Sequence, residues 1–223
     1  MNKLMVKIAR SILLSHYVRK VLERIYRFYA IARFEEGLDP FAGGYYSRPW
    51  IATPVGRTMN MGIAEKNLLD IKRILDKEGI RFWLMFGTFL GAYRDHDIIS
   101  YDEDTDLAIC AEDLPRLLSC EAILAKEGFY LGLAENLVTL YRSGEHTDFY
   151  LFRLNGTKRV NDPIKFDVDA FETYCEVQFL GEKWRILSEP ERWLKYTYGE
   201  DWRAPIKGKG IRDRAYGEEF ESG

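Results

Sequence analysis

The residues best suited to chemistry in this sequence form an acidic run, Asp102, Asp104 and Asp106, which leads directly into the apolar residues 107–109. Side chains two positions apart on a strand point to the same face, so Asp104 and Asp106 are expected to lie together, about 6–7 Å apart along the chain. Neighbouring carboxylates repel one another unless a cation neutralises them, and hard oxygen ligands suit Mg²⁺ or Mn²⁺. The run therefore predicts a metal site with Asp102 in a supporting role, and the alternative is a solvated acidic loop.

A second chemical element is the turn Gly87-Thr88, which follows an apolar segment at 82–86 that is predicted to be a short buried strand. The next residues, FLGAYR, are predicted to form a helical turn, so backbone N–H groups of the Gly-Thr turn would face an anionic ligand. Arg94 could clamp a phosphate with two hydrogen bonds, or it could instead pair with one of the acids that follow it. A phosphate-binding turn, an arginine and metal-binding carboxylates together indicate phosphoryl-group transfer.

A third carboxylate is expected from a later strand. Asp167 and Asp169 lie in the predicted strand at 164–173 and would share one face, so their spacing alone does not choose between them. One of them is expected to be a catalytic base or metal ligand and the other its support, while the alternative is a pair on the solvent side of an edge strand. His146 and Asp148 are candidate substrate contacts, but a His-Thr-Asp sequence ahead of a strand is more typical of ordinary surface.

The elements that must position these residues follow one another as helix, strand, helix and then several strands. This order indicates an α+β fold with a mixed β-sheet flanked by helices, because a doubly wound fold would alternate strands and helices regularly. Hydrophobic periodicity and turn residues predict the bounds. Helices are expected at 63–78, 112–127 and 191–199, and strands at 82–86, 107–109, 129–133, 137–142, 149–154, 164–173, 177–180 and 184–187.

The sequence divides into four segments by composition. Residues 1–35 are predicted to form a basic amphipathic helix, since positions 1–30 hold seven Lys or Arg residues and one acid. This helix would pack on protein, or it would lie on an anionic membrane surface. Residues 36–60 are predicted to be an irregular connector, residues 61–205 the catalytic domain, and residues 206–223 a polar, mobile tail.

Composition excludes several classes of protein. A net charge of −3 argues against a nucleic-acid-binding protein, which would be strongly basic. Three scattered cysteines do not make a disulfide framework and are expected to be buried thiols in a reducing compartment. Because no apolar run is long enough to span a bilayer, we expect a cytoplasmic protein, with peripheral contact on the inner face of the membrane if residues 1–30 bind lipid.

The motifs together resemble a known family. GTFLGAYR, followed by DHDIISYDEDTDLAI, resembles the signature of the LicD/fukutin-type transferases. KFDVDAF and YGEDWRAP resemble later elements of the same family, so that the likeness extends from about residue 80 to residue 205. The resemblance implies the nucleotidyltransferase fold that this family shares with polymerase-β-like enzymes.

The resemblance also implies roles for particular residues. The Gly-Thr turn would bind the phosphates of a nucleotide, and Asp104 and Asp106 would be the principal ligands of Mg²⁺ or Mn²⁺. Asp169 best matches the third carboxylate of the family, with Asp167 as the competing choice. In this interpretation Arg94 stabilises the charge of a diphosphate and Asp169 activates an acceptor hydroxyl.

Three functions are compatible with these features. The first, implied by the resemblance, is transfer of a phosphorylated alcohol, such as phosphocholine or a polyol phosphate, from a CDP-activated donor to a glycan or lipid-linked glycan. The second is transfer of a nucleoside monophosphate from an NTP to a small molecule or protein, which would use the same acids. The third is a non-catalytic, membrane-associated binding protein, which the intact acids argue against.

Overall fold

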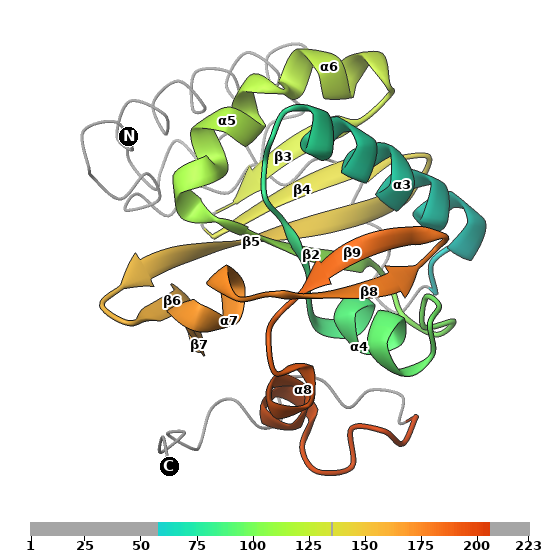
Figure 1. Ribbon diagram of the computed structural model, residues 1–223. Helices are drawn as coiled ribbons and strands as arrows, with labels where there is room; N and C mark the ends of the chain where they lie inside the picture. The colour runs from blue at the N-terminus through green and yellow to red at the C-terminus, as the bar shows by residue number, and fades with distance from the viewer. Residues whose placement is uncertain (1–57, 135, 206–223) are drawn as a thin grey trace, which may run out of the picture.

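A computed structural model describes residues 58–134 and 136–205 (Figure 1). The predicted basic helix at 1–35, residues 36–57 of the predicted connector and the predicted tail at 206–223 lie outside the described residues. Within the described part of the chain, no helix is both long and apolar enough to cross a bilayer.

A mixed β-sheet forms the centre of the fold, with five strands in the spatial order β1-β2-β5-β4-β3. Strands β2 and β5 are parallel neighbours, and the other neighbouring pairs are antiparallel. The far end of β5 continues into antiparallel pairing with β6 and then β7, while β8 and β9 form a separate hairpin. The strand bounds are β1 Trp83–Leu84, β2 Thr105–Cys110, β3 Tyr130–Ala134, β4 Leu137–Arg142, β5 Glu145–Asn155, β6 Lys158–Asn161, β7 Ile164–Asp167, β8 Cys175–Phe179 and β9 Glu182–Ile186.

Helices flank this sheet, with α3 in front of the strands, α5 and α6 above and α4 below in Figure 1. Helix α3 is amphipathic and buries Leu68, Ile71 and Leu75 in the core, at the spacing of one helical face. Helix α4 follows β1 directly and packs on β2, and α8 in turn packs on α4. The helix bounds are α3 Met61–Lys77, α4 Phe86–Arg94, α5 Leu114–Ser119, α6 Glu121–Lys126, α7 Val168–Glu172 and α8 Pro190–Tyr198, with a short 3₁₀ turn η1 at Ala111–Asp113.

The predicted mixed sheet with flanking helices is confirmed, but several element bounds differ from the prediction. The helix predicted at 112–127 is divided into η1, α5 and α6. The break between α5 and α6 is a turn at Cys120, whose N–H donates to the Leu117 carbonyl three residues back. Strand β6 was not predicted, and α4 begins at Phe86, so that the Gly-Thr turn is the first turn of a helix. The predicted burial of the cysteines is right for Cys110 and Cys120 and wrong for Cys175, which is exposed on β8.

The prediction for 164–173 is wrong in its second half, where the strand ends at Asp167 and α7 follows. Both Ala170 and Phe171 are buried, and the Phe171 ring lies 5.1 Å from the Trp83 ring. Consecutive residues of a strand point to opposite faces, so a strand would have turned one of these two side chains away from the core. A helical turn allows both to face inward, and tertiary packing therefore overrides the strand pattern here.

Gly91 of α4 lies close to the loop at residues 97–99. A Cβ atom at Gly91 would lie 2.6 Å from the Asp97 carbonyl oxygen and 3.0 Å from Ile99 Cγ1. We expect Gly91→Ala to lower the free energy of unfolding by about 1–3 kcal/mol, because the loop must move away from the helix. Urea unfolding followed by circular dichroism measures the change.

Gly62 in the first turn of α3 provides the matched control. A Cβ there would meet only Asn60 Oδ1, at an ordinary 3.7 Å, so Gly62→Ala is expected to be neutral or stabilising by up to about 1 kcal/mol. Equal effects of the two substitutions would contradict the close approach at Gly91.

Candidate active site

The parallel pairing of β2 with β5 brings the acids of two distant segments together. The register places Thr105 beside Thr147 and Asp106 beside Asp148. Side chains alternate along each strand, and the Thr105 and Thr147 hydroxyl oxygens meet on one face, 2.8 Å apart. The acids therefore project from the opposite face of the sheet.

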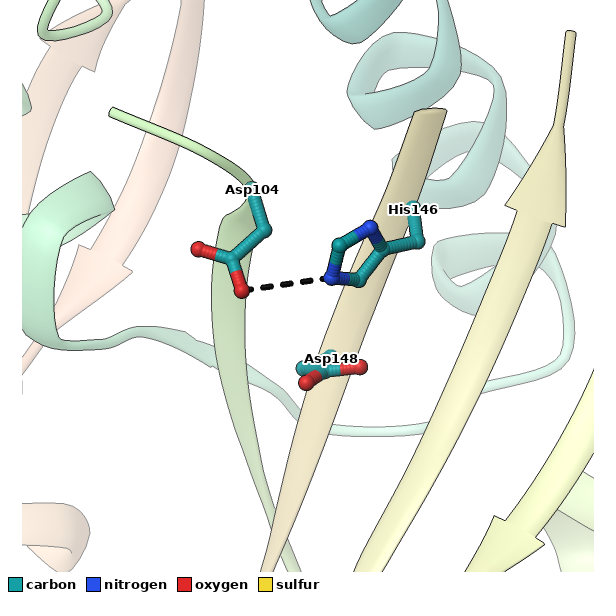
Figure 2. A group of neighbouring side chains, drawn as sticks. All are labelled: Asp104, His146 and Asp148. Carbon is teal, nitrogen blue, oxygen red and sulfur yellow. Dashed lines mark ion pairs between the residues drawn. The ribbon is translucent and has the colours of Figure 1, made fainter. Parts of the chain in front are cut away.

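Asp104, His146 and Asp148 form the tightest polar group on that face (Figure 2). One ligand atom from each of the three side chains lies within 4.8 Å of the others, and His146 Nε2 is 3.3 Å from Asp104 Oδ2. The donor atoms are carboxylate oxygens and an imidazole nitrogen, which are common ligands of divalent metals. The chemistry and spacing of these donors fit a divalent cation.

Asp106 lies next to Asp148 in the β2–β5 register and is only 7% exposed. Its backbone N–H donates to Thr88 Oγ1 at 2.8 Å, and its carboxylate accepts a hydrogen bond from the Gly87 backbone N–H. Burial raises the pKa of Asp106 well above its ordinary value, and the charges of Asp104 and Asp148 raise it further. A bound cation would relieve this repulsion.

The Gly-Thr turn is positioned by an unusual backbone conformation at Phe86. Phe86 has a φ of +44°, in the left-handed region that side chains other than glycine rarely adopt. Its ring is buried and packs edge-on against Tyr150 with 4.5 Å between centroids, and this contact holds the residue in place. The chain thereby turns from β1 into α4 with the Gly87 N–H directed at Asp106. Strain of this kind is frequent at functional sites.

Asp102 packs against the same turn and has a strongly shifted pKa. A Cβ atom at position 87 would overlap the Asp102 carboxylate, so the glycine allows this side chain to lie close against the turn. Burial, followed by the charge of Asp104, raises the pKa of Asp102 to about 6, while a hydrogen bond from the Glu103 N–H opposes the rise. Asp102 thus lies against the Gly-Thr turn, and its supporting role at a metal site stays a prediction.

Side chains of the neighbouring strand β4 contact both His146 and Asp148 of β5. The Thr139 hydroxyl donates to Asp148 Oδ1 at 2.6 Å, and the Tyr141 ring stacks on His146 with centroids 5.6 Å apart. These contacts follow from the β4–β5 register, which pairs the residues in the same way. Burial lowers the pKa of His146, but the hydrogen bond to Asp104 and nearby carboxylate charges raise it more, so that the net pKa is raised.

Arg94 at the end of α4 is held by contacts with Asp95 and Trp202. Its guanidinium pairs with Asp95 through contacts of 2.6 Å and 2.8 Å and donates to the Trp202 carbonyl at 3.4 Å. The Tyr93 and Trp202 rings also meet, 5.9 Å apart. Arg94 therefore pairs with a following acid, which was the alternative expected from the sequence. A phosphate-binding role for Arg94 stays a prediction.

The structure does not bring Asp167 and Asp169 into the group. Asp167 pairs with Lys158 at 2.5 Å and with Arg192 at 3.0 Å, and the Lys158 hydrogen bond is the main cause of its lowered pKa. Asp169 is exposed on α7. The two were expected to share a strand face, and they do not because α7 begins between them.

The sequence named His146 and Asp148 as candidate substrate contacts and favoured ordinary surface for them, whereas the structure places both on β5 beside Asp104 and Asp106. The strand was predicted from residue 149, but it begins at Glu145. Ser143 and Gly144 both have positive φ, of 56° and 85°, which is the conformation of a two-residue hairpin turn. The Ser-Gly pair was a readable turn signal, and it would have placed both residues inside the strand.

The mixed sheet, the Gly-Thr turn and the acids on adjacent strands define a domain of the nucleotidyltransferase type. The family model described as LicD/FKTN/FKRP, nucleotidyltransferase domain, matches residues 79–197. This match covers more than half of the chain, which therefore belongs to that family. The resemblance seen in the motifs is confirmed, and the predicted enzyme class, a transferase with this domain, agrees with the family.

Individual relatives are similar over part of their length. Ribitol-5-phosphate transferase FKTN of Homo sapiens is 29% identical over 161 residues, covering 64% of this chain and 34% of that protein. Ribitol 5-phosphate transferase FKRP of Mus musculus is 43% identical over 54 residues, covering 24% of this chain and 10% of that protein. The chain thus spans about a third of the length of FKTN.

Two solved structures are also similar. Lincosamide antibiotic adenylyltransferase LnuA bound to lincomycin has a TM-score of 0.44 at 14% identity, covering 62% of this chain and 86% of that one. The antibiotic-resistance factor ANT(2'')-Ia has a TM-score of 0.46 at 18% identity, covering 69% of this chain and 81% of that one.

The raised carboxyl pKa values predict how stability depends on pH when no divalent metal is bound. Asp102 has a pKa of about 6 in the folded protein and an ordinary value of 3.8. Its folded form binds protons more tightly, so its contribution to stability is complete below the ordinary value and is lost as pH rises through about 6. We expect the free energy of unfolding of the metal-stripped protein to fall between pH 4 and pH 7.

Asp102→Asn is the matched variant for this measurement. This substitution should reduce the fall in the free energy of unfolding between pH 4 and pH 7 by at most about 3 kcal/mol. The figure is an upper limit because partial exposure screens the charge. The lowered pKa values of Asp70 and Asp167 act below their ordinary 3.8 and do not enter this window. Denaturant unfolding at several pH values measures both proteins, and parallel pH profiles would contradict the assignment.

Proposed function

We propose that this protein transfers a phosphorylated alcohol from a CDP-activated donor to a glycan acceptor, with the help of a divalent metal. The observation that carries the proposal is the convergence of Asp104, Asp106 and Asp148 beside the Gly87 turn. The family supports the reaction class, because its members FKTN and FKRP are named as ribitol 5-phosphate transferases. A ribitol phosphate or a related polyol phosphate is therefore the first donor group to test.

The metal would be held by Asp104, Asp106 and Asp148. When bound, a Mg²⁺ or Mn²⁺ ion would neutralise the charge of the donor diphosphate. We assign the third carboxylate to Asp148 in place of Asp169, because Asp148 lies next to Asp106 in the strand register and Asp169 is exposed on α7.

The remaining residues of the site have positioning roles in this proposal. The first turn of α4 would direct backbone N–H groups at the donor phosphates, as the beginning of a helix commonly does. Thr88 keeps this turn in contact with β2 through its hydrogen bond from the Asp106 N–H. Arg94 would add positive charge only after leaving Asp95, so its part is secondary. Phosphoryl transfer needs mainly such positioning and charge neutralisation.

The environment of the acids also includes two tyrosines. Burial raises the pKa of Tyr150 and of Tyr198, and in both the charge of Asp106 is the next cause, so both phenols lie near the acids and stay protonated. Tyr198 ends α8 in the YGEDWRAP segment that resembles the family motif. We propose that these two hydroxyls donate hydrogen bonds to substrate oxygens.

The experiment that tests the proposal is a screen of CDP-activated alcohols. CDP-ribitol, CDP-glycerol and CDP-choline are each incubated with the full-length protein, a mixture of glycan acceptors and either Mg²⁺ or Mn²⁺, and the release of CMP is measured. We expect CMP release that requires metal and stops with EDTA. Release of pyrophosphate from an NTP, with no CMP from any CDP-alcohol, would replace the proposal by nucleotidyl transfer.

A further inference from the structure

We infer that His146 is a direct ligand of the metal, and that its imidazole makes the site prefer Mn²⁺ to Mg²⁺. This inference rests on the proposed function, because it concerns the same metal site. It adds a nitrogen donor to a set that otherwise consists of carboxylates.

The position of the imidazole nitrogen is the first support. His146 Nε2 and Asp104 Oδ2 are 3.3 Å apart, and Asp148 offers an oxygen within 4.8 Å of both. Two donors bound to one ion at about 2.1–2.2 Å and at right angles to each other are about 3 Å apart. The pair is thus separated like neighbouring ligands of a single ion, and Figure 2 shows the imidazole directed at Asp104 above Asp148.

The surroundings of the ring are the second support. Tyr141 stacks on His146 at an interplanar angle of 23°, and the β4–β5 register pairs these two residues. The neighbouring pair in the same register is Thr139 and Asp148, whose hydrogen bond orients the carboxylate. One strand therefore orients both polar residues of β5, in the way that residues around a metal site commonly hold its ligands.

The chemistry of the donors gives the preference. Mg²⁺ is a small, hard ion that is held by oxygen ligands and water, whereas imidazole nitrogen binds first-row transition metals. Mn²⁺ accepts both carboxylate oxygen and imidazole nitrogen. A site that contains Asp104, Asp148 and His146 should therefore bind Mn²⁺ more tightly than an all-carboxylate site would, with little gain for Mg²⁺.

The competing explanation is that His146 only forms an ion pair with Asp104 and never contacts the metal. The two explanations differ in one measurable property, which is a bond between the metal and a histidine nitrogen. Pulsed electron paramagnetic resonance of the Mn²⁺-loaded protein detects such a nitrogen directly and does not depend on activity. The 223-residue chain has three histidines, so the signal can be assigned by substitution.

We expect nitrogen modulation in the Mn²⁺ spectrum of the full-length, untagged protein, and a changed modulation after labelling with ¹⁵N-histidine. His146→Asn should abolish the modulation and weaken Mn²⁺ binding by roughly ten- to a hundredfold. Mg²⁺ binding, measured by competition with Mn²⁺, should change by only a few fold. His96→Asn is the matched control, because His96 is exposed with a φ of 56° that asparagine tolerates, and it should change neither result.

The outcomes separate the inference from the proposed function. Mn²⁺ binding without nitrogen modulation in the ¹⁵N-labelled and unlabelled protein would overturn the role of His146 and leave the carboxylate site intact. No binding of either Mn²⁺ or Mg²⁺ would overturn the metal site itself, and the inference with it. Because the labelled wild-type protein decides the first point, the test holds even if His146→Asn does not fold.

Discussion

Replacing Asp148 by asparagine is expected to lower the rate of metal-dependent transfer by roughly a hundredfold or more. Asp148 stands beside Asp106 in the parallel register of β2 and β5, and it contributes to the closest group of donor atoms. Loss of one carboxylate weakens both metal binding and charge neutralisation, and about 2.7 kcal/mol of lost stabilisation corresponds to a hundredfold in rate. Metal-dependent CMP release from the best CDP-alcohol measures the effect.

Asp169→Asn is the decisive partner variant, since the sequence motif favours Asp169 and the structure favours Asp148. The Asp169 side chain is exposed on α7, so its substitution should leave the rate within about twofold. If Asp169→Asn abolished transfer while Asp148→Asn did not, the assignment made from the strand register would be wrong. Circular dichroism of both variants establishes that folding is intact.

Asp106→Asn should also remove activity, yet it should stabilise the metal-stripped protein at neutral pH. Asp106 is buried, and the negative charges of Asp104, Asp148 and Asp102 all raise its pKa. A neutral amide keeps an oxygen that accepts from the Gly87 N–H and removes the repulsion. If the relief is about 1–2 kcal/mol, Tm should rise by roughly 2–8 °C.

Thermal unfolding without divalent metal at pH 7.5 measures this rise, and repeating it with Mn²⁺ measures how much each protein gains from the ion. The wild-type protein should gain more than Asp106→Asn, because binding to the native state stabilises it. Asp169→Asn again serves as a control and should leave Tm nearly unchanged. A lower Tm for metal-stripped Asp106→Asn would show that the repulsion around Asp106 is not a source of instability.

Local patterns in the sequence predicted much of the secondary structure. The amphipathic spacing of Leu68, Ile71 and Leu75 predicted α3, and the predicted strand at 137–142 has the bounds of β4. The hairpin of β8 and β9 was also expected from its Gly-containing turn. These elements could be predicted because period and turn residues reflect which side of a helix or strand faces the core.

The same reasoning was wrong where tertiary packing acts against a local pattern. The alternation in KFDVDAF is typical of a strand, but burying both Ala170 and Phe171 requires a helical turn after Asp167. Asp167 and Asp169 therefore do not share a strand face, although the sequence had predicted that they would.

The sequence by itself was enough to predict the kind of chemistry, because the spacing of Asp104 and Asp106 before an apolar strand and the nearby Gly-Thr turn are local features. It also determined the family, through motifs that can be read along the chain. Only the tertiary structure decided that β5 lies parallel to β2, and hence that His146 and Asp148 join these acids. The pairing of strands about forty residues apart depends on packing across the whole sheet, which no local pattern encodes.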